Sequence, residues 1–264
     1  MLLGMTGHAG FSAARVARPR QREKAADNVR RAEDAMTDVG SSARQSIKQL
    51  ILVPAIVTLV VTLLRLLGEL QHWSTAWFTT DMGPSIVAIV WLAPLFGVYF
   101  ALRLAARGEG PASPWRAIVF AMLGVAVVVA SFFVPPALHL NSSFYTRLIA
   151  IWSILALGTL ATLPGWPTLF KTMLAYAYSA RIPVAILMFF AIRGSWGTHY
   201  DAAPSDMPAG MALLPKYLWL GFFPQLIFWV GFTTVSGMLC GSIAAASARL
   251  VRRAQPGAER RSAA

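Results

Sequence analysis

The chain has 264 residues, of which 56% are hydrophobic and 13% are charged, and its mean hydropathy is +0.58. A soluble domain carries about 25% charged residues, so this composition excludes an ordinary soluble protein and favours an integral membrane protein. The formal net charge of +12 would suit nucleic acid, but the basic residues flank apolar blocks. That arrangement predicts anionic lipid at the cytoplasmic face as the counter-charge, and no nucleic acid.

Residues 1–48 form a polar segment with nine Lys or Arg and five Asp or Glu, and they show no sustained apolar period. Such a segment cannot bury enough apolar surface to offset the entropy lost on ordering it. The sequence therefore predicts a basic, largely disordered cytoplasmic tail that lacks the apolar core of a secretory signal peptide.

Six apolar blocks follow, each about as long as the roughly 20 residues that a helix needs to cross a bilayer. An open sheet would leave backbone groups unsatisfied in lipid, so each block is expected to be an α-helix. Together they predict an all-α integral membrane protein with a six-helix transmembrane domain over 49–246 and a basic cytoplasmic tail over 247–264. The blocks are residues 49–67, 84–102, 117–138, 144–163, 169–192 and 217–240.

Proline occurs within or at the edge of most blocks, which predicts that several of the helices are kinked, because proline removes a backbone donor. Freed carbonyls bind ions at the broken helices of some transporters, but a structural kink is the favoured interpretation. The residues concerned are Pro54, Pro94, Pro135, Pro136, Pro183 and Pro224.

The distribution of basic residues sets the orientation of these helices. With six spans, 18 of the 23 Lys and Arg fall on one face, whereas the opposite face carries Arg147, Arg193 and Lys216, and Arg65 and Arg181 lie within helices. Cytoplasmic loops carry the excess of Lys and Arg in membrane proteins. The sequence therefore predicts a multi-pass protein of a bacterial-type inner membrane with both termini cytoplasmic.

Arg181 is a cation in the middle of an apolar block. It follows Lys171 by ten residues and precedes Arg193 by twelve, so about 15 Å of helix separates it from the nearer end. A charge at that depth costs at least about 2.5–3.5 kcal/mol. None of the eleven Asp and Glu lies in an apolar core, so no acid in the membrane is available to pair with it.

Two interpretations of Arg181 remain open. In the first, Arg181 lines a pocket that accepts an anion. Tyr178 would lie on the same helical face, Ser179 would offer the carbonyl that Pro183 frees, and Gln225 would lie at a similar depth in the last block. In the second, Arg181 binds backbone carbonyls and holds its helix against neighbouring helices.

Histidines and acids gather at the predicted outer face, where imidazole and carboxylate groups together can bind a divalent metal. The candidates are His72, His139, His199 and Asp201. No spacing among them matches a metal motif, so no metal and no cofactor is predicted. Nearby, Arg65 and Glu69 are one helical turn apart, which suits an ion pair.

Small residues recur every fourth position in the last block, at Gly237, Gly241 and Ala245. This period lets helices approach closely. Packing within the chain is favoured over a dimer interface.

The sequence contains no recognisable catalytic motif, neither G-x-S-x-G nor H-E-x-x-H. Three hypotheses remain. The leading one is a membrane protein that binds or transports a small, anionic solute near Arg181. The second is a non-catalytic scaffold or regulatory subunit that packs against itself or a membrane partner through the last helix, and the third is a membrane enzyme that acts on lipid.

Overall fold

A computed structural model of the chain describes residues 47–80, 87–140 and 143–254. Within these ranges the chain is helical and has no strand, and six helices are long and apolar enough to cross a membrane. This confirms the predicted all-α, six-span class. The predicted tail over 1–48 lies almost wholly outside the described residues, as do 255–264.

The six spans follow the six apolar blocks closely. The first five are Ile47–Leu70, η1 (Ile89–Trp91) with α2 (Leu92–Ala106), α3 (Pro114–Ala137), α4 (Phe144–Ala161) and α5 (Pro167–Gly194). The sixth is longer and consists of α6 (Leu213–Tyr217), the π-helical segments η2 (Leu218–Phe222) and η3 (Pro224–Trp229), and α7 (Val230–Ala254). Helix therefore continues past the predicted boundary at residue 246, because the Ala-, Leu- and Arg-rich residues beyond it favour helix.

Local sequence fixes where several spans begin. The Ser113 side chain accepts a hydrogen bond from the Arg116 N–H (3.4 Å) at the start of α3, and the Ser143 side chain accepts one from the Thr146 N–H (3.1 Å) at the start of α4. Serine is among the best residues at this capping position. Pro167 opens α5, where its missing donor costs nothing.

The predicted proline kinks remain predictions. Pro183 lies inside α5, which is helical without interruption on both sides of it. Pro224, in contrast, opens the π-helical segment η3.

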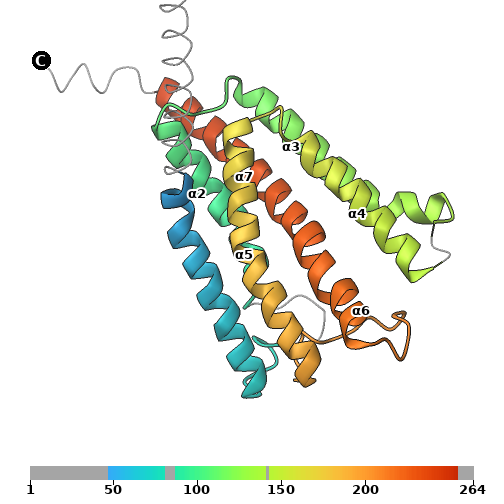
Figure 1. The fold of residues 1–264 in the computed structure, drawn as a ribbon. Coiled ribbons are helices and arrows are strands. Elements are labelled where there is room, and N and C mark those ends of the chain that lie inside the picture. Colours follow the sequence, from blue (N-terminus) through green and yellow to red (C-terminus); the bar gives the residue numbers. More distant parts are fainter. Residues whose placement is uncertain (1–46, 81–86, 141–142, 255–264) are drawn as a thin grey trace, which may run out of the picture. The chain divides into compact units, whose positions relative to one another are not determined.

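The chain divides into two units, Met1–Gln49 and Leu50–Ala264, and the second contains the bundle. In it, α7 packs against α2, α3, α4 and α5, and Figure 1 shows α3 and α4 as a neighbouring pair. Half of the residues in the apolar windows of α5 and the sixth span are buried, compared with 22–33% in the other four spans. The last two spans therefore form the centre of the bundle.

The stripe of small residues in α7 lies against α2. A Cβ atom on Gly97 of α2 would lie 2.4 Å from the Cα of Gly237, and one on Gly241 would lie 2.6 Å from the Gly97 carbonyl oxygen. Ala245 is buried in the core that these helices share. The backbones of α2 and α7 thus meet where only glycine fits, and this face of α7 is occupied within the chain.

The orientation of the bundle can be tested with reporter fusions. The charge distribution predicts cytoplasmic signals from fusions after Arg107 and Arg253, and external signals from fusions after Asp81 and Asp206. Alkaline phosphatase and green fluorescent protein fusions at each position measure this directly. A cytoplasmic signal after Asp206 would contradict the six-span orientation.

Candidate functional site

A cavity of about 600 Å³ lies within one half of the bundle. All six spans contribute to its lining, for example through Thr62 in the first span, Phe132 in α3 and Trp152 in α4. Four residues of the segment between α5 and α6 also contribute, so the cavity lies toward the end of the bundle that this segment occupies. They are His199, Tyr200, Ala202 and Pro204. The positive-inside rule predicts that this end is external.

Arg181 projects from α5 into the lining of this cavity and is only 4% exposed. Its Nη1 donates a hydrogen bond to the Gln225 Oε1 at 3.4 Å, and its Cζ lies 4.8 Å from the centroid of the Trp229 ring. Its Nε is buried and has no hydrogen-bond partner among the residues that the structure describes. A guanidinium carries five N–H donors, so most of the binding capacity of Arg181 is unused within the described residues.

The two groups that contact Arg181 come from the same π-helical segment, η3, one turn apart. Gln225 is 7% exposed and its Nε2 donates to the Met188 sulfur at 3.3 Å, which orients the amide oxygen toward Arg181. Short π-helical segments are frequent at functional sites. The expected proximity of Gln225 to Arg181 is present, whereas its part in binding a solute stays a prediction.

Tyr178 and Ser179 do not line the cavity, which corrects the expected surroundings of Arg181. Tyr178 is 40% exposed, and the Ser179 hydroxyl donates to the Ala175 carbonyl of its own helix at 2.8 Å. Successive helical residues are rotated by about 100°, so Ser179 points away from Arg181. The tyrosine that lines the cavity is Tyr200, which the sequence analysis did not single out.

Two further arginines line the cavity, and each is paired with an acid. Arg65 Nε lies 2.7 Å from Glu69 Oε1, which confirms the predicted ion pair, and Arg147 forms an ion pair with Asp206. No Asp or Glu is among the described residues of the lining. Arg181 is therefore the arginine of this cavity whose charge no carboxylate within the described residues balances.

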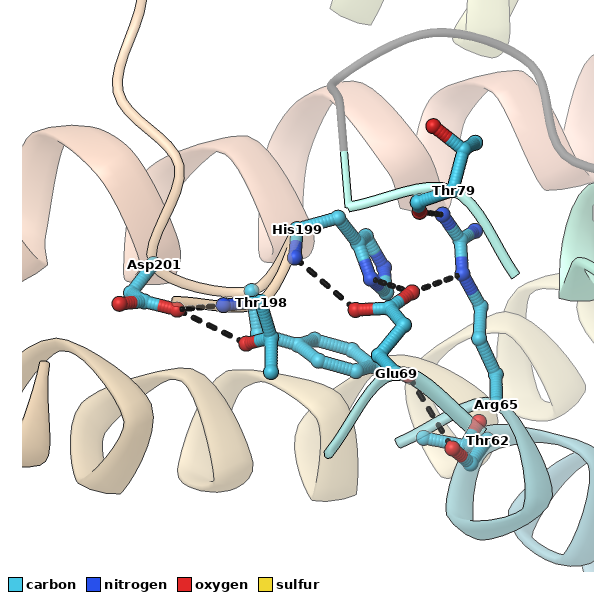
Figure 2. Close-up of polar contacts among 8 residues, drawn as sticks. Thr62, Arg65, Glu69, Thr79, Thr198, His199 and Asp201 are labelled. Atoms are coloured by element: carbon cyan, nitrogen blue, oxygen red, sulfur yellow. Dashed lines mark hydrogen bonds and ion pairs between the residues drawn. The ribbon is translucent and has the colours of Figure 1, made fainter. Parts of the chain in front are cut away.

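Glu69 is the centre of a buried polar cluster beside the cavity, drawn in Figure 2. Its side chain is fully buried and accepts hydrogen bonds from Arg65 Nε and from the backbone N–H of His199 (2.9 Å), and His199 Nδ1 lies 2.5 Å from its Oε1. Arg65 also donates through Nη2 to the Thr79 carbonyl at 3.3 Å. The cluster thus ties the end of the first span to the segment after α5.

His199 lies in a turn, residues 197–201, that is stabilised by hydrogen bonds within the turn. The Asp201 carboxylate accepts hydrogen bonds from the backbone N–H groups of Gly197 (2.9 Å) and Thr198 (2.8 Å) and from the Thr198 hydroxyl (2.8 Å). Tyr200 then donates to the Thr62 carbonyl of the first span at 3.1 Å. As a result, His199 and Tyr200 are fixed where they line the cavity.

The four candidate metal ligands are not brought together. The described residues contain no group of three His, Cys, Asp or Glu that could hold a metal ion. His199 faces Glu69, and Asp201 is occupied by its own turn. Asp81, an acid of the same predicted face, lies outside the described residues.

His72 and His139 have a different role, because both end a helix. Each has a left-handed backbone, with φ of 52° and 55°, and histidine is enriched among the non-glycine residues that tolerate this. Trp73 N–H donates to the Gly68 carbonyl and His72 N–H to the Glu69 carbonyl, and the same pattern recurs around His139. These are Schellman caps, so helix termination accounts for both histidines.

Burial lowers the pKa of His199 below its usual 6.5, with a smaller contribution from Arg65, whereas Glu69 and Asp201 act in the opposite direction. As the pH falls, His199 accepts a proton at a higher pH in the unfolded chain than in the folded one. Its contribution to stability is therefore complete above about pH 6.5 and is lost as the pH falls below that value. We expect the melting temperature in mild detergent to fall between pH 7.5 and 5.5, and His199→Gln to reduce this fall.

The exposed His139 supplies the matched control for this measurement. His139→Gln, measured in the same buffers, gives the effect of a histidine-to-glutamine change outside the Glu69 cluster. Equal slopes for the wild type and His199→Gln would show that His199 does not titrate in this window.

The arrangement combines a buried arginine with unused donors, two acid-paired arginines and a largely apolar cavity. Such a site can hold and orient a negatively charged group, since an apolar cavity with a few convergent polar groups is the usual form of a small-molecule site. No family model matches the chain, and neither curated proteins nor solved structures give a match to it.

Proposed function

We propose that this chain is a multi-pass protein of a bacterial-type inner membrane that binds and moves a small oxyanion, with Arg181 as the cation that recognises it. The observation that carries the proposal is the state of Arg181, whose side chain is buried against a cavity of about 600 Å³. Among the described residues, no acid pairs with it and its Nε has no hydrogen-bond partner. A carboxylate or phosphate would satisfy both the charge and the open donors.

The contacts of Arg181 favour binding over a structural pin. An arginine that only holds helices together should use most of its N–H donors in hydrogen bonds to the protein. Arg65 comes closer to this, because it bonds Glu69 at 2.7 Å and the Thr79 carbonyl at 3.3 Å. In the part of the chain that the structure describes, Arg181 makes one hydrogen bond, long at 3.4 Å, and contacts one aromatic face. Arg181 is therefore a buried cation with most of its donors unused within the described residues, and it lies next to a cavity.

The surroundings of the cavity increase the attraction for an anion. Arg65 and Arg147 also line it, and their acid partners, Glu69 and Asp206, do not. The rest of the lining is mostly apolar and aromatic, and a charge–charge attraction is stronger in such a low-dielectric environment than in water. The cavity lies toward the predicted external end of the bundle, where Arg147 is part-exposed.

The other two hypotheses receive less support. A scaffold would need tight packing around Arg181 and a free small-residue face on α7, but a cavity adjoins Arg181 and the Gly237–Gly241 face packs on α2. A lipid-acting enzyme built on a metal would need its histidines and acids within metal-bond reach of one another, and the described residues contain no group of three that could hold a metal ion.

Arg181→Lys tests the recognition directly, because lysine keeps the charge and loses the planar fork of donors. We expect butanoate, phosphate or sulfate to raise the melting temperature of the purified wild type. The substitution should lower the affinity for that anion by about tenfold or more, while the protein still folds. Ligand-induced thermal shifts and titration calorimetry measure both effects.

The exposed Arg193 on the same helix gives the control, since Arg193→Lys should bind as the wild type does. Unchanged anion affinity in Arg181→Lys, or no response of the wild type to any of the three anions, would refute the proposal.

A further inference from the structure

A second hollow lies beside the cavity, on the outer surface of the bundle. It is a groove of about 410 Å³ between α4 and the π-helical segments of the sixth span. Ile149, Ser153 and Ala156 form one wall, and Phe223 and Ile227 form the other. Since 149 and 153 are exposed positions of a membrane span, the groove faces lipid.

The walls of this groove are almost entirely apolar, and Ser153 is the residue of the lining that carries a hydroxyl. No polar solute would gain from leaving water for such a surface, because its polar groups would lose their hydrogen bonds without compensation. An apolar chain in the bilayer loses nothing there. The chemistry of the groove therefore selects an acyl or alkyl chain.

The groove and the cavity share two residues, Trp152 of α4 and Trp219 of η2, which line both. Their rings are stacked, with centroids 5.6 Å apart and planes 19° apart. Only this pair of side chains belongs to both linings within the described residues. The stacked pair therefore lies between the groove and the Arg181 cavity, and a molecule that occupies both hollows has to lie across it.

We infer that the ligand is a single-chain amphiphile with an oxyanion head group. The head group lies in the cavity at Arg181, and the chain passes Trp152 and Trp219 into the groove, so that the ligand enters sideways from the bilayer. This inference rests on the proposed function, because Arg181 must bind an oxyanion for the head group to be placed. It adds the class of ligand and its route.

Three probes separate the head group from the chain: butanoate has the head group alone, dodecanoate has both parts, and dodecanol has the chain alone. Binding of each is measured to the full-length protein in phosphatidylcholine nanodiscs, after subtraction of empty nanodiscs. We expect dodecanoate to bind at least about tenfold more tightly than butanoate, because each added CH₂ concentrates the ligand in the bilayer and the groove accepts the chain. Dodecanol should not displace bound dodecanoate.

A substitution that fills the groove tests the route. Ser153 is exposed and lines the groove. Ser153→Trp should therefore lower the affinity for dodecanoate at least tenfold and leave the affinity for butanoate unchanged. The control is Leu157→Trp, one turn further along α4, where the residue is 64% exposed and is not part of the groove. Ser153→Phe serves as a second variant if the tryptophan lowers the melting temperature.

The outcomes distinguish the two proposals. If both carboxylates bind and are lost in Arg181→Leu, but Ser153→Trp and Ser153→Phe bind dodecanoate normally, the sideways route is wrong and the anion site stands. Displacement by dodecanol would also overturn the inference, because the head group would not matter. If neither carboxylate binds above the empty nanodiscs, the carboxylate amphiphile is excluded, and a parallel titration with phosphate decides the anion site.

Discussion

Arg181→Leu is expected to abolish oxyanion binding and to leave the ligand-free protein as stable as the wild type, or more stable. The substitution removes a cation that is 4% exposed and that no acid in the described residues balances. Insertion scales assign at least about 2.5 kcal/mol to such a charge. The substitution also removes two stabilising contacts, a hydrogen bond of 3.4 Å to Gln225 and the cation–π contact with Trp229. A desolvated cation–π contact contributes about 2 kcal/mol.

The loss of binding should be much larger than that seen in Arg181→Lys. Removing one partner of a buried, hydrogen-bonded charge pair costs about 2–5 kcal/mol, which corresponds to roughly 30-fold to several thousand-fold in affinity. Titration of the purified variant with the anion that binds the wild type measures this loss. A melting curve without ligand gives the stability in the same preparation.

Arg193→Leu is the matched control, because it removes an exposed cation from the end of the same helix. It should change neither anion affinity nor melting temperature by much. A large fall in the ligand-free melting temperature of Arg181→Leu would instead support the structural interpretation, in which Arg181 holds helices together, and would overturn the anion site as stated.

Glu69→Gln is expected to give a large loss of stability. The Glu69 side chain is fully buried and faces Arg65 Nε at 2.7 Å, His199 N–H at 2.9 Å and His199 Nδ1 at 2.5 Å. Glutamine has nearly the same shape but no charge, and one of its two terminal atoms is a donor that would face these donors. Breaking a buried ion pair costs about 3–5 kcal/mol.

Asp206→Asn offers the comparison, since its pair with Arg147 leaves 33% and 44% of the two side chains exposed. Exposed pairs contribute about 1 kcal/mol or less. Melting curves of both variants beside the wild type in one detergent test the difference. Similar small shifts in both would show that the Glu69 cluster contributes no more than a surface ion pair.

Loss of the Glu69 cluster should also alter the position of residues that line the cavity. Glu69 holds His199, and the next residue, Tyr200, lines the cavity and donates to Thr62. We therefore expect Glu69→Gln to weaken anion binding indirectly, through the position of the 197–201 turn.

The sequence by itself determined the features that depend on neighbours along the chain. The spans follow from apolar blocks of sufficient length, because the bilayer imposes helix on any such block. The Arg65–Glu69 pair follows from one turn of helix, and the Gly237–Gly241 seam from a period of four. The unusual position of Arg181 was visible as a charge in the middle of an apolar block, residues 169–192, that contains no Asp or Glu.

Only the tertiary structure decided which groups meet across the bundle. Glu69 and His199 are 130 residues apart, and Arg181 and Gln225 are 44 apart, so neither spacing nor periodicity could establish these contacts. The tyrosine near the cavity is Tyr200 rather than Tyr178, because the rotation of α5 within the packed bundle sets which of its side chains turn outward. The cavity exists for the same reason: it is the space that six helices and one turn leave between them, and no single segment encodes it.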